Sequence, residues 1–180
     1  MTVPEHLEYY LGKIAYGIKS DKEHRVNALI FPNTPEDRLT TYTTLGLSKH
    51  CVGYKSRFEL VFVASNADNE TNLANMLIWF AEIMIKEHRP ILRGEVIYLP
   101  ETIVPESGMD ALYVSCPFYF PDDFQDLEAE DNDVVFPLLV PVYKSEAKNI
   151  AQNGWSQFED FLLKNEVDNL WDLYREVFSW

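Results

Sequence analysis

Residues 39–64 read LTTYTTLGLSKHCVGYKSRFELVFVA, and this stretch decides the fold. Its first part, 39–45, holds four threonines and a tyrosine, and its last part, 57–64, ends in a run of apolar residues. Such β-branched and aromatic residues suit a pleated, half-buried surface. Gly46 and Ser48 interrupt the pattern where a turn is expected. The stretch therefore predicts two strands on either side of a glycine-containing turn.

Glu59 is the polar residue that stands out in this stretch, because it directly precedes the apolar run 60–63. One interpretation places its carboxylate on the solvent face of the strand. The other places it partly inside the protein, where it accepts hydrogen bonds from backbone N–H groups of the turn from Gly46 to Ser48. The sequence leaves both interpretations open.

Patterns outside this stretch predict further helices and strands in a mixed order. Spacings of three and four between apolar residues predict helices at 4–20, 146–152, 155–163 and 169–178. The same spacings predict a long helix that follows the polar residues 66–72 and ends before Pro90. Short β-rich runs predict strands at 26–31, 94–99, 111–120 and 134–143, with prolines 137 and 141 weakening the ends of the last one. The chain is expected to be α+β, with a mixed, largely antiparallel sheet packed by helices.

Length and charge limit the classes of protein to consider. With 180 residues and 47% apolar content, the chain fits a single domain spanning residues 1–180. Its net charge of −14 argues against nucleic acid or an anionic membrane as the main partner, because both are polyanions. The start, MTVPEHLEYY, lacks a signal-peptide pattern, and no segment approaches the ~20 consecutive apolar residues of a membrane span. A cytoplasmic location is expected.

The residue types that usually carry catalysis form no recognisable motif. No histidine has a partner histidine four residues away, and the sequence contains no GxGxxG, P-loop or GxSxG. His50 and Cys51 are adjacent, but neighbouring residues of an extended chain point to opposite faces. Cys51 and Cys116 form no CxxC and are expected to be reduced, structural thiols. We therefore predict no catalytic residues, no metal and no cofactor.

The segment 122–133, DDFQDLEAEDND, is the strongest compositional signal in the chain. It is either a solvated loop between two strands or a docking surface for a basic protein. In the second case Tyr119, Phe120 and Phe124 are the expected aromatic anchors. The candidate partner-binding residues are Asp122, Asp123, Phe124, Asp126, Glu128, Glu130 and Asp131.

The order of several short motifs resembles a known family. The turn TTLGLS at 43–48 is similar to that of the suppressor-of-fused-like domain, and the resemblance extends over about residues 26–175. The pieces that follow the turn are a strand containing Glu59, the long helix ending at 88–90, a strand beginning near Gly94 and a late strand leading into a helix. The resemblance implies structural roles for Thr44, Gly46, Ser48, Glu59, Gly94, Pro141 and Glu146.

The resemblance also implies an α/β sandwich that binds another protein and is not an enzyme. Single-domain bacterial members of this family act as immunity proteins, which neutralise polymorphic toxins by binding them. A nuclease toxin would present a basic groove that complements a charge of −14. Two alternatives stay open: a regulatory or scaffolding interaction module of the same fold, and an enzyme using His50, Cys51 or Glu59. The sequence predicts no oligomeric state.

Overall fold

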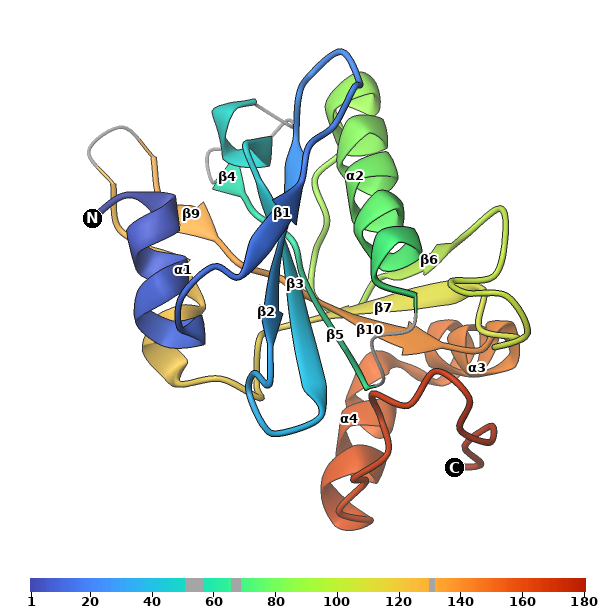
Figure 1. Ribbon diagram of the computed structural model, residues 1–180. Helices are drawn as coiled ribbons and strands as arrows, with labels where there is room; N and C mark the ends of the chain where they lie inside the picture. Colours follow the sequence, from blue (N-terminus) through green and yellow to red (C-terminus); the bar gives the residue numbers. More distant parts are fainter. Residues whose placement is uncertain (51–56, 66–68, 130–131) are drawn as a thin grey trace.

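The computed structural model describes residues 1–50, 57–65, 69–129 and 132–180. A seven-stranded sheet forms the centre of the protein. The strand order is β1-β2-β3-β5-β10-β7-β6 (Figure 1). All neighbouring strands are antiparallel except β5 and β10, which are parallel. The strands are β1 (Tyr16–Ile18), β2 (Asn27–Pro32), β3 (Leu39–Leu45), β5 (Val61–Ser65), β6 (Val96–Tyr98), β7 (Ala111–Ser115) and β10 (Leu138–Val142). The predicted α+β class with a mixed, largely antiparallel sheet is confirmed.

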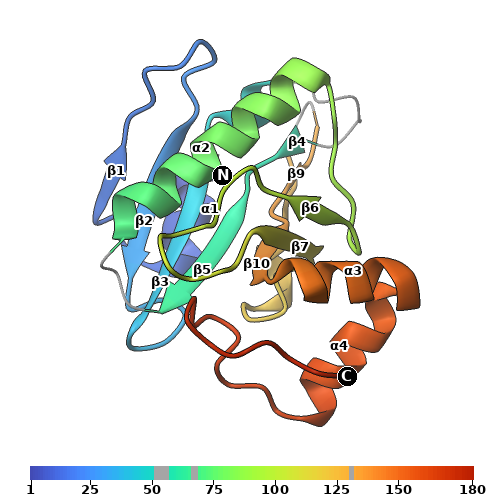
Figure 2. The same cartoon turned by 90° about the vertical axis from the view of Figure 1, so that its right-hand side faces the viewer.

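Helices cover both faces of this sheet. The helices are α1 (Val3–Leu11), α2 (Glu70–Glu87), α3 (Lys144–Asn153) and α4 (Trp155–Lys164). Figures 1 and 2 show α2 against one face and α1 against the other. A hydrophobic core lies on each face of the sheet, and successive strand residues point to opposite cores. Phe62 packs in the core with α2, whereas Val61 and Val63 pack in the core with α1, α3 and α4. No helix in the described part of the chain is long and apolar enough to cross a membrane.

The predicted strand 57–64 is two strands that belong to different sheets. β4 (Arg57–Phe58) joins β9 (Val134–Val135) and β8 (Asp126–Leu127) in a small sheet, and β5 joins the large one. Between them, the N–H of Glu59 donates to the carbonyl of Val135, and the N–H of Leu60 donates to the hydroxyl of Thr44. The backbone therefore changes partners at Glu59.

The predicted strand 134–143 also divides, at Pro137, into β9 and β10. Pro141, which was expected to weaken the end of this strand, instead lies inside β10 and is buried. It pairs with Leu112 of β7 on one side, and the pairing of β10 with β5 ends earlier, at Leu139. Because Pro141 has no partner in β5, its lack of an N–H removes no hydrogen bond between β10 and β5.

The helix predicted at 4–20 is shorter than expected, and the helix predicted at 169–178 does not form. α1 ends at Leu11 and not near residue 20, because Gly12 has a φ of 86° and the chain turns away to form β1. Residues 169–178 form turns and irregular chain and no helix, with Tyr174 and Val177 exposed. Leu170 and Trp171 enter the core on the side of α1, α3 and α4, and Leu173 enters the core beneath α2. The tail therefore crosses the end of the sheet, where the N–H of Ser65 donates to the carbonyl of Trp171 at 2.9 Å.

Candidate functional site

The acidic segment folds against α1 as a short 3-10 turn, η3 (Asp122–Phe124), followed by β8. The side chains of Asp122, Asp123, Asp126 and Glu128 are exposed. Glu130 and Asp131 lie outside the described residues. The ring of His6 on α1 fixes the segment, because its Nε2 lies 3.1 Å from the carbonyl oxygen of Phe124, to which only an N–H can donate. Residues 122–128 thus expose four carboxylates, and His6 holds the backbone between them at Phe124.

The aromatic residues of this segment point inward. Phe124 is fully buried and Phe120 is 8% exposed. Phe124 stacks on His6 and on Phe136, with ring centroids 5.7 and 5.4 Å away. The prediction that Phe124 contacts a partner is therefore wrong, and Phe120 is likewise no surface anchor. The acidic residues of this stretch therefore face water, and the aromatic residues between them attach it to the core.

The surroundings of His6 predict a pH dependence for this region. Burial is the largest influence on the pKa of His6 and lowers it, while the hydrogen bond to Phe124 and the charge of Asp126 raise it; the balance lies below the ordinary value. A folded pKa below the unfolded one means that the unfolded chain binds more protons, so stability rises with pH. This stabilisation is present above about pH 6.5 and is lost as the pH falls through the folded pKa.

We therefore expect the free energy of unfolding to decrease on acidification below about pH 6.5, and to do so less steeply in a His6→Gln variant. Glutamine retains an N–H donor for the carbonyl of Phe124 but does not titrate. Urea unfolding between pH 5 and 8 measures both slopes. Identical slopes in the two proteins would contradict the assignment to His6.

Thr44, Gly46, Ser48 and Glu59 meet at one buried site. The carboxylate of Glu59 is fully buried, and its Oε1 accepts from the N–H groups of Gly46 and Ser48 at 2.9 and 3.1 Å and from the Ser48 hydroxyl at 2.6 Å. Its Oε2 accepts from the Thr44 hydroxyl at 2.7 Å. Gly46 has a φ of 113°, which other residues rarely adopt. The interpretation of Glu59 as a surface carboxylate is wrong, and the buried one is confirmed.

Glu146 forms a second buried carboxylate site, whose partner the sequence did not reveal. Arg175 donates to both of its oxygens, at 2.7 and 2.8 Å, and both side chains are fully buried. Glu146 also accepts from the N–H groups of Tyr143 and Phe178, at 3.0 and 2.7 Å. The carbonyl of Pro141 accepts from Arg175 at 3.3 Å. This site joins the C-terminal tail to the start of α3.

Gly94 has a packing role of its own. A Cβ at this position would lie 2.4 Å from the ring of Trp155, and the φ of 93° also favours glycine. Arg93 lies over the same ring, 4.6 Å from its centroid. Glu59 and Glu146 of the family motif thus make their contacts inside the protein.

The contacts of His24 and His50 lie within the described ranges. His24 Nδ1 lies 2.8 Å from Glu82, and His50 Nε2 lies 3.3 Å from the backbone carbonyl of His24. Cys51 lies outside the described residues, so its relation to His50 and Cys116 is not described. Among the residues that the structure describes, no group of three or more histidine, cysteine, aspartate or glutamate side chains could hold a metal ion.

Comparison with known proteins identifies the family to which this chain belongs. The family model described as suppressor of fused protein matches residues 22–176. The chain belongs to the suppressor-of-fused family. A curated relative, immunity protein YqcF of Bacillus subtilis, is 24% identical over 162 residues, which cover 87% of this chain and 83% of the relative.

Solved structures of suppressor-of-fused proteins share the fold. A putative suppressor-of-fused homologue from Neisseria gonorrhoeae superimposes with a TM-score of 0.78 at 15% identity, over 98% of this chain and 94% of its own. The Sufu–Fu complex gives a TM-score of 0.67 at 16% identity, over 83% and 78% of the two chains. Drosophila Suppressor of Fused gives 0.55 at 17% identity, and the match covers 69% of this chain but only 35% of that protein. The resemblance found in the motif order is confirmed.

Proposed function

We propose that this member of the suppressor-of-fused family is an immunity-type protein, which neutralises a polymorphic toxin in the cytoplasm by binding it and catalyses no reaction. The observation that carries the proposal is the similarity to an immunity protein along 87% of the chain. Two features of the chain support it. The net charge is −14, and the acidic segment exposes Asp122, Asp123, Asp126 and Glu128.

The charge suggests what kind of toxin fits. An enzyme that acts on nucleic acid carries a basic substrate groove, and an acidic protein is attracted to such a groove over long distances. Occupation of the groove blocks the substrate without any bond being made or broken. We therefore propose a basic toxin domain, with a nuclease as the best match in charge.

Co-expression with each candidate toxin encoded near the gene tests this function. Cells that produce both proteins are expected to grow, cells that produce the toxin alone are expected to die, and the two proteins are expected to co-purify. A double His50→Ala and Cys51→Ala variant should protect as well as the wild type, since no catalysis is involved. Loss of protection in that variant without loss of binding would favour an enzyme.

A regulatory or scaffolding module is the second candidate, because a family member of the same fold has been solved in the Sufu–Fu complex. Such a module would co-purify stably with its partner but give no protection in the growth assay. Protection in the growth assay therefore distinguishes the two candidates.

Neutralising the acidic segment is expected to slow association with the toxin. The variant combines Asp122→Asn, Asp123→Asn, Asp126→Asn and Glu128→Gln. We expect the association rate at low salt to fall about tenfold and to depend less on salt, because exposed charges act mainly on encounter. Stopped-flow kinetics across a salt series measures both effects.

A control variant removes four exposed carboxylates elsewhere and so changes the net charge equally. It combines Asp21→Asn, Glu23→Gln, Glu87→Gln and Glu101→Gln, all at exposed positions. If both variants slow association equally, net charge alone steers the toxin, and the acidic segment is not a local docking surface.

A further inference from the structure

An apolar groove lies between α4, the turn after β7 and the C-terminal tail. It has a volume of about 460 Å³, and its apolar wall includes Phe118, Tyr119, Leu163, Val167 and Trp171. Leu163 is 77% exposed and Phe118 is 48% exposed. The ring of Phe118 stacks on that of Trp171 with centroids 6.2 Å apart. The groove therefore offers aromatic surface to water.

The polar groups beneath the groove are bonded to one another. Glu159 accepts from Arg93 at 2.5 Å, from the hydroxyl of Tyr113 at 2.6 Å and from that of Ser115 at 3.1 Å. Burial raises the pKa of Glu159, but these hydrogen bonds outweigh it and hold the pKa below its ordinary value, so the carboxylate is charged. Arg93, the cation in the lining, is thus already paired. The site is preformed, which reduces the ordering cost of binding.

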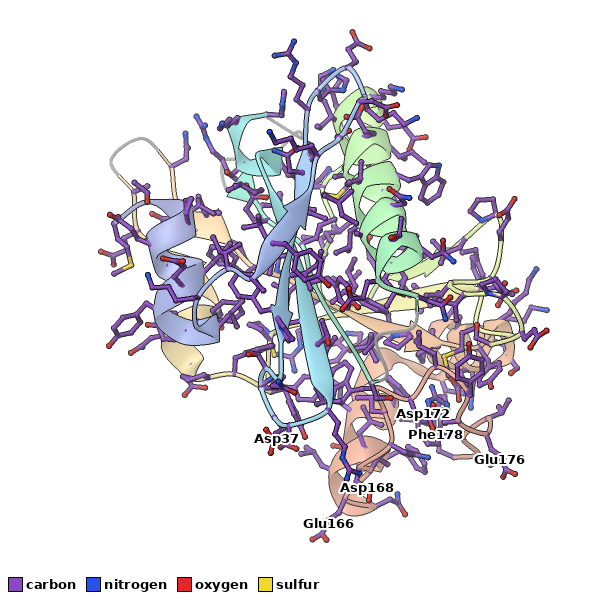
Figure 3. All side chains as sticks on the ribbon, in the orientation of Figure 1. Asp37, Glu166, Asp168, Asp172, Glu176 and Phe178 are labelled. Atoms are coloured by element: carbon purple, nitrogen blue, oxygen red, sulfur yellow. The ribbon has the colours of Figure 1, made fainter. Side chains whose placement is uncertain are left out.

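Carboxylates lie at the groove near Tyr119 and at the end of α4. Glu166 belongs to its lining, and the hydroxyl of Tyr119 donates to Glu36 at 2.9 Å. Burial, Glu36 and the charge of Asp168 raise the pKa of Tyr119, and the hydrogen bond to Trp171 opposes them. Figure 3 labels Glu166 and Asp168 after α4, Asp37 in the turn before β3, and Asp172 and Glu176 on the C-terminal tail.

These acidic side chains come from the turn before β3, the loop after α4 and the C-terminal tail, which are far apart in sequence. The same segments hold fewer cations: Arg38 and Lys164 are exposed, and Arg175 is buried against Glu146. Glu166 in the lining and Glu36 at Tyr119 therefore make this side of the groove negative, which favours a positively charged partner.

The groove provides what the acidic segment lacks. The aromatic side chains of that segment are buried, so it offers charge without an anchor. A second depression of about 380 Å³ shares Arg93, Ser115 and Cys116 with the groove, and its far wall includes Gln125 and Asp126. The acidic segment and the groove thus border one connected surface.

We propose that this groove is the anchoring subsite for the basic toxin domain, and that it takes an apolar or aromatic side chain flanked by lysine or arginine. This inference rests on the proposed function. Binding energy concentrates where an aromatic contact is shielded from water by a polar rim. The acidic segment then steers the encounter, and the groove holds the complex together.

The test uses a catalytically inactive form of the candidate toxin against which the protein protects cells, and it measures association and dissociation rates. Phe118→Ala is expected to raise the dissociation rate at least tenfold with little change in the association rate. Leu163→Lys, at a position 77% exposed, should weaken binding at least tenfold while leaving the thermal unfolding midpoint unchanged. The matched control is Tyr98→Ala, since Tyr98 is 47% exposed and pairs with Ala111 at the opposite end of β7. It should change Kd by less than about twofold.

The possible failures are distinct. If Phe118→Ala and Leu163→Lys bind the toxin as the wild type does and still protect cells, the groove is not the anchor, although the proposed function stands. If the wild type does not bind the toxin, both proposals fail. If the free wild type self-associates and Leu163→Lys abolishes this, the groove holds a second copy of the chain and the inference is wrong.

Discussion

Replacement of Glu59 by alanine is expected to lower the free energy of unfolding by about 3 to 5 kcal/mol. The change leaves the N–H groups of Gly46 and Ser48 and the hydroxyls of Ser48 and Thr44 buried without their acceptor. Each unsatisfied buried donor costs roughly 1 to 3 kcal/mol, and the cavity adds to this. Part of the loss is offset, because a buried charge is removed. Urea unfolding followed by tryptophan fluorescence measures the difference.

Two further variants separate the hydrogen bonds of Glu59 from a general effect of losing a carboxylate. Glu59→Gln keeps the shape and one acceptor oxygen, so its loss should lie between those of the wild type and the alanine variant. Glu101→Ala removes a carboxylate from an exposed position and should change stability by less than about 0.5 kcal/mol. Equal stability of Glu59→Ala and the wild type would mean that the turn does not need the carboxylate.

The sequence predicted the central part of the fold because its signals there are local. The threonine-rich run 39–45 forms β3, and Gly46 does adopt a positive φ. Glu59 had two interpretations, since a carboxylate before an apolar run does not reveal whether the preceding turn folds back over it. The deciding contacts join residues 11 to 15 positions apart. Helical or strand periodicity does not report contacts at that distance.

Periodicity was misleading where tertiary contacts were stronger than local preference. The apolar spacing in 169–178 is that of a helix, yet these residues form turns and irregular chain. A helix there would have to give up the pairing of Arg175 with Glu146, 29 residues earlier, and the bond from Ser65 to Trp171, 106 residues away. The candidate site shows the same limit. The acidic segment is contiguous and was visible in the sequence, whereas the carboxylates at the groove come from distant segments and were not.

Arg175→Met is expected to lower the free energy of unfolding by about 3 to 5 kcal/mol, as is usual when one partner of a buried ion pair is removed. Glu146 would then remain fully buried, with only the N–H groups of Tyr143 and Phe178 as partners. Methionine retains most of the apolar packing over the ring of Phe178, above which the guanidinium lies at 3.8 Å. The loss measured by urea unfolding therefore reports mainly the uncompensated charge.

The double variant Glu146→Leu with Arg175→Met decides whether that loss comes from the unpaired charge. Neither charge is then buried, so the double variant should be more stable than Arg175→Met alone, because a buried ion pair is often replaced by apolar residues at little cost. A double variant that is less stable than either single variant would contradict this. It would mean that the bonds from the pair to the Phe178 N–H and the Pro141 carbonyl hold the tail in place. Trp171 lies on the same tail and lines the groove, so in that case limited proteolysis should cut the tail of the double variant first, and toxin binding should weaken with it.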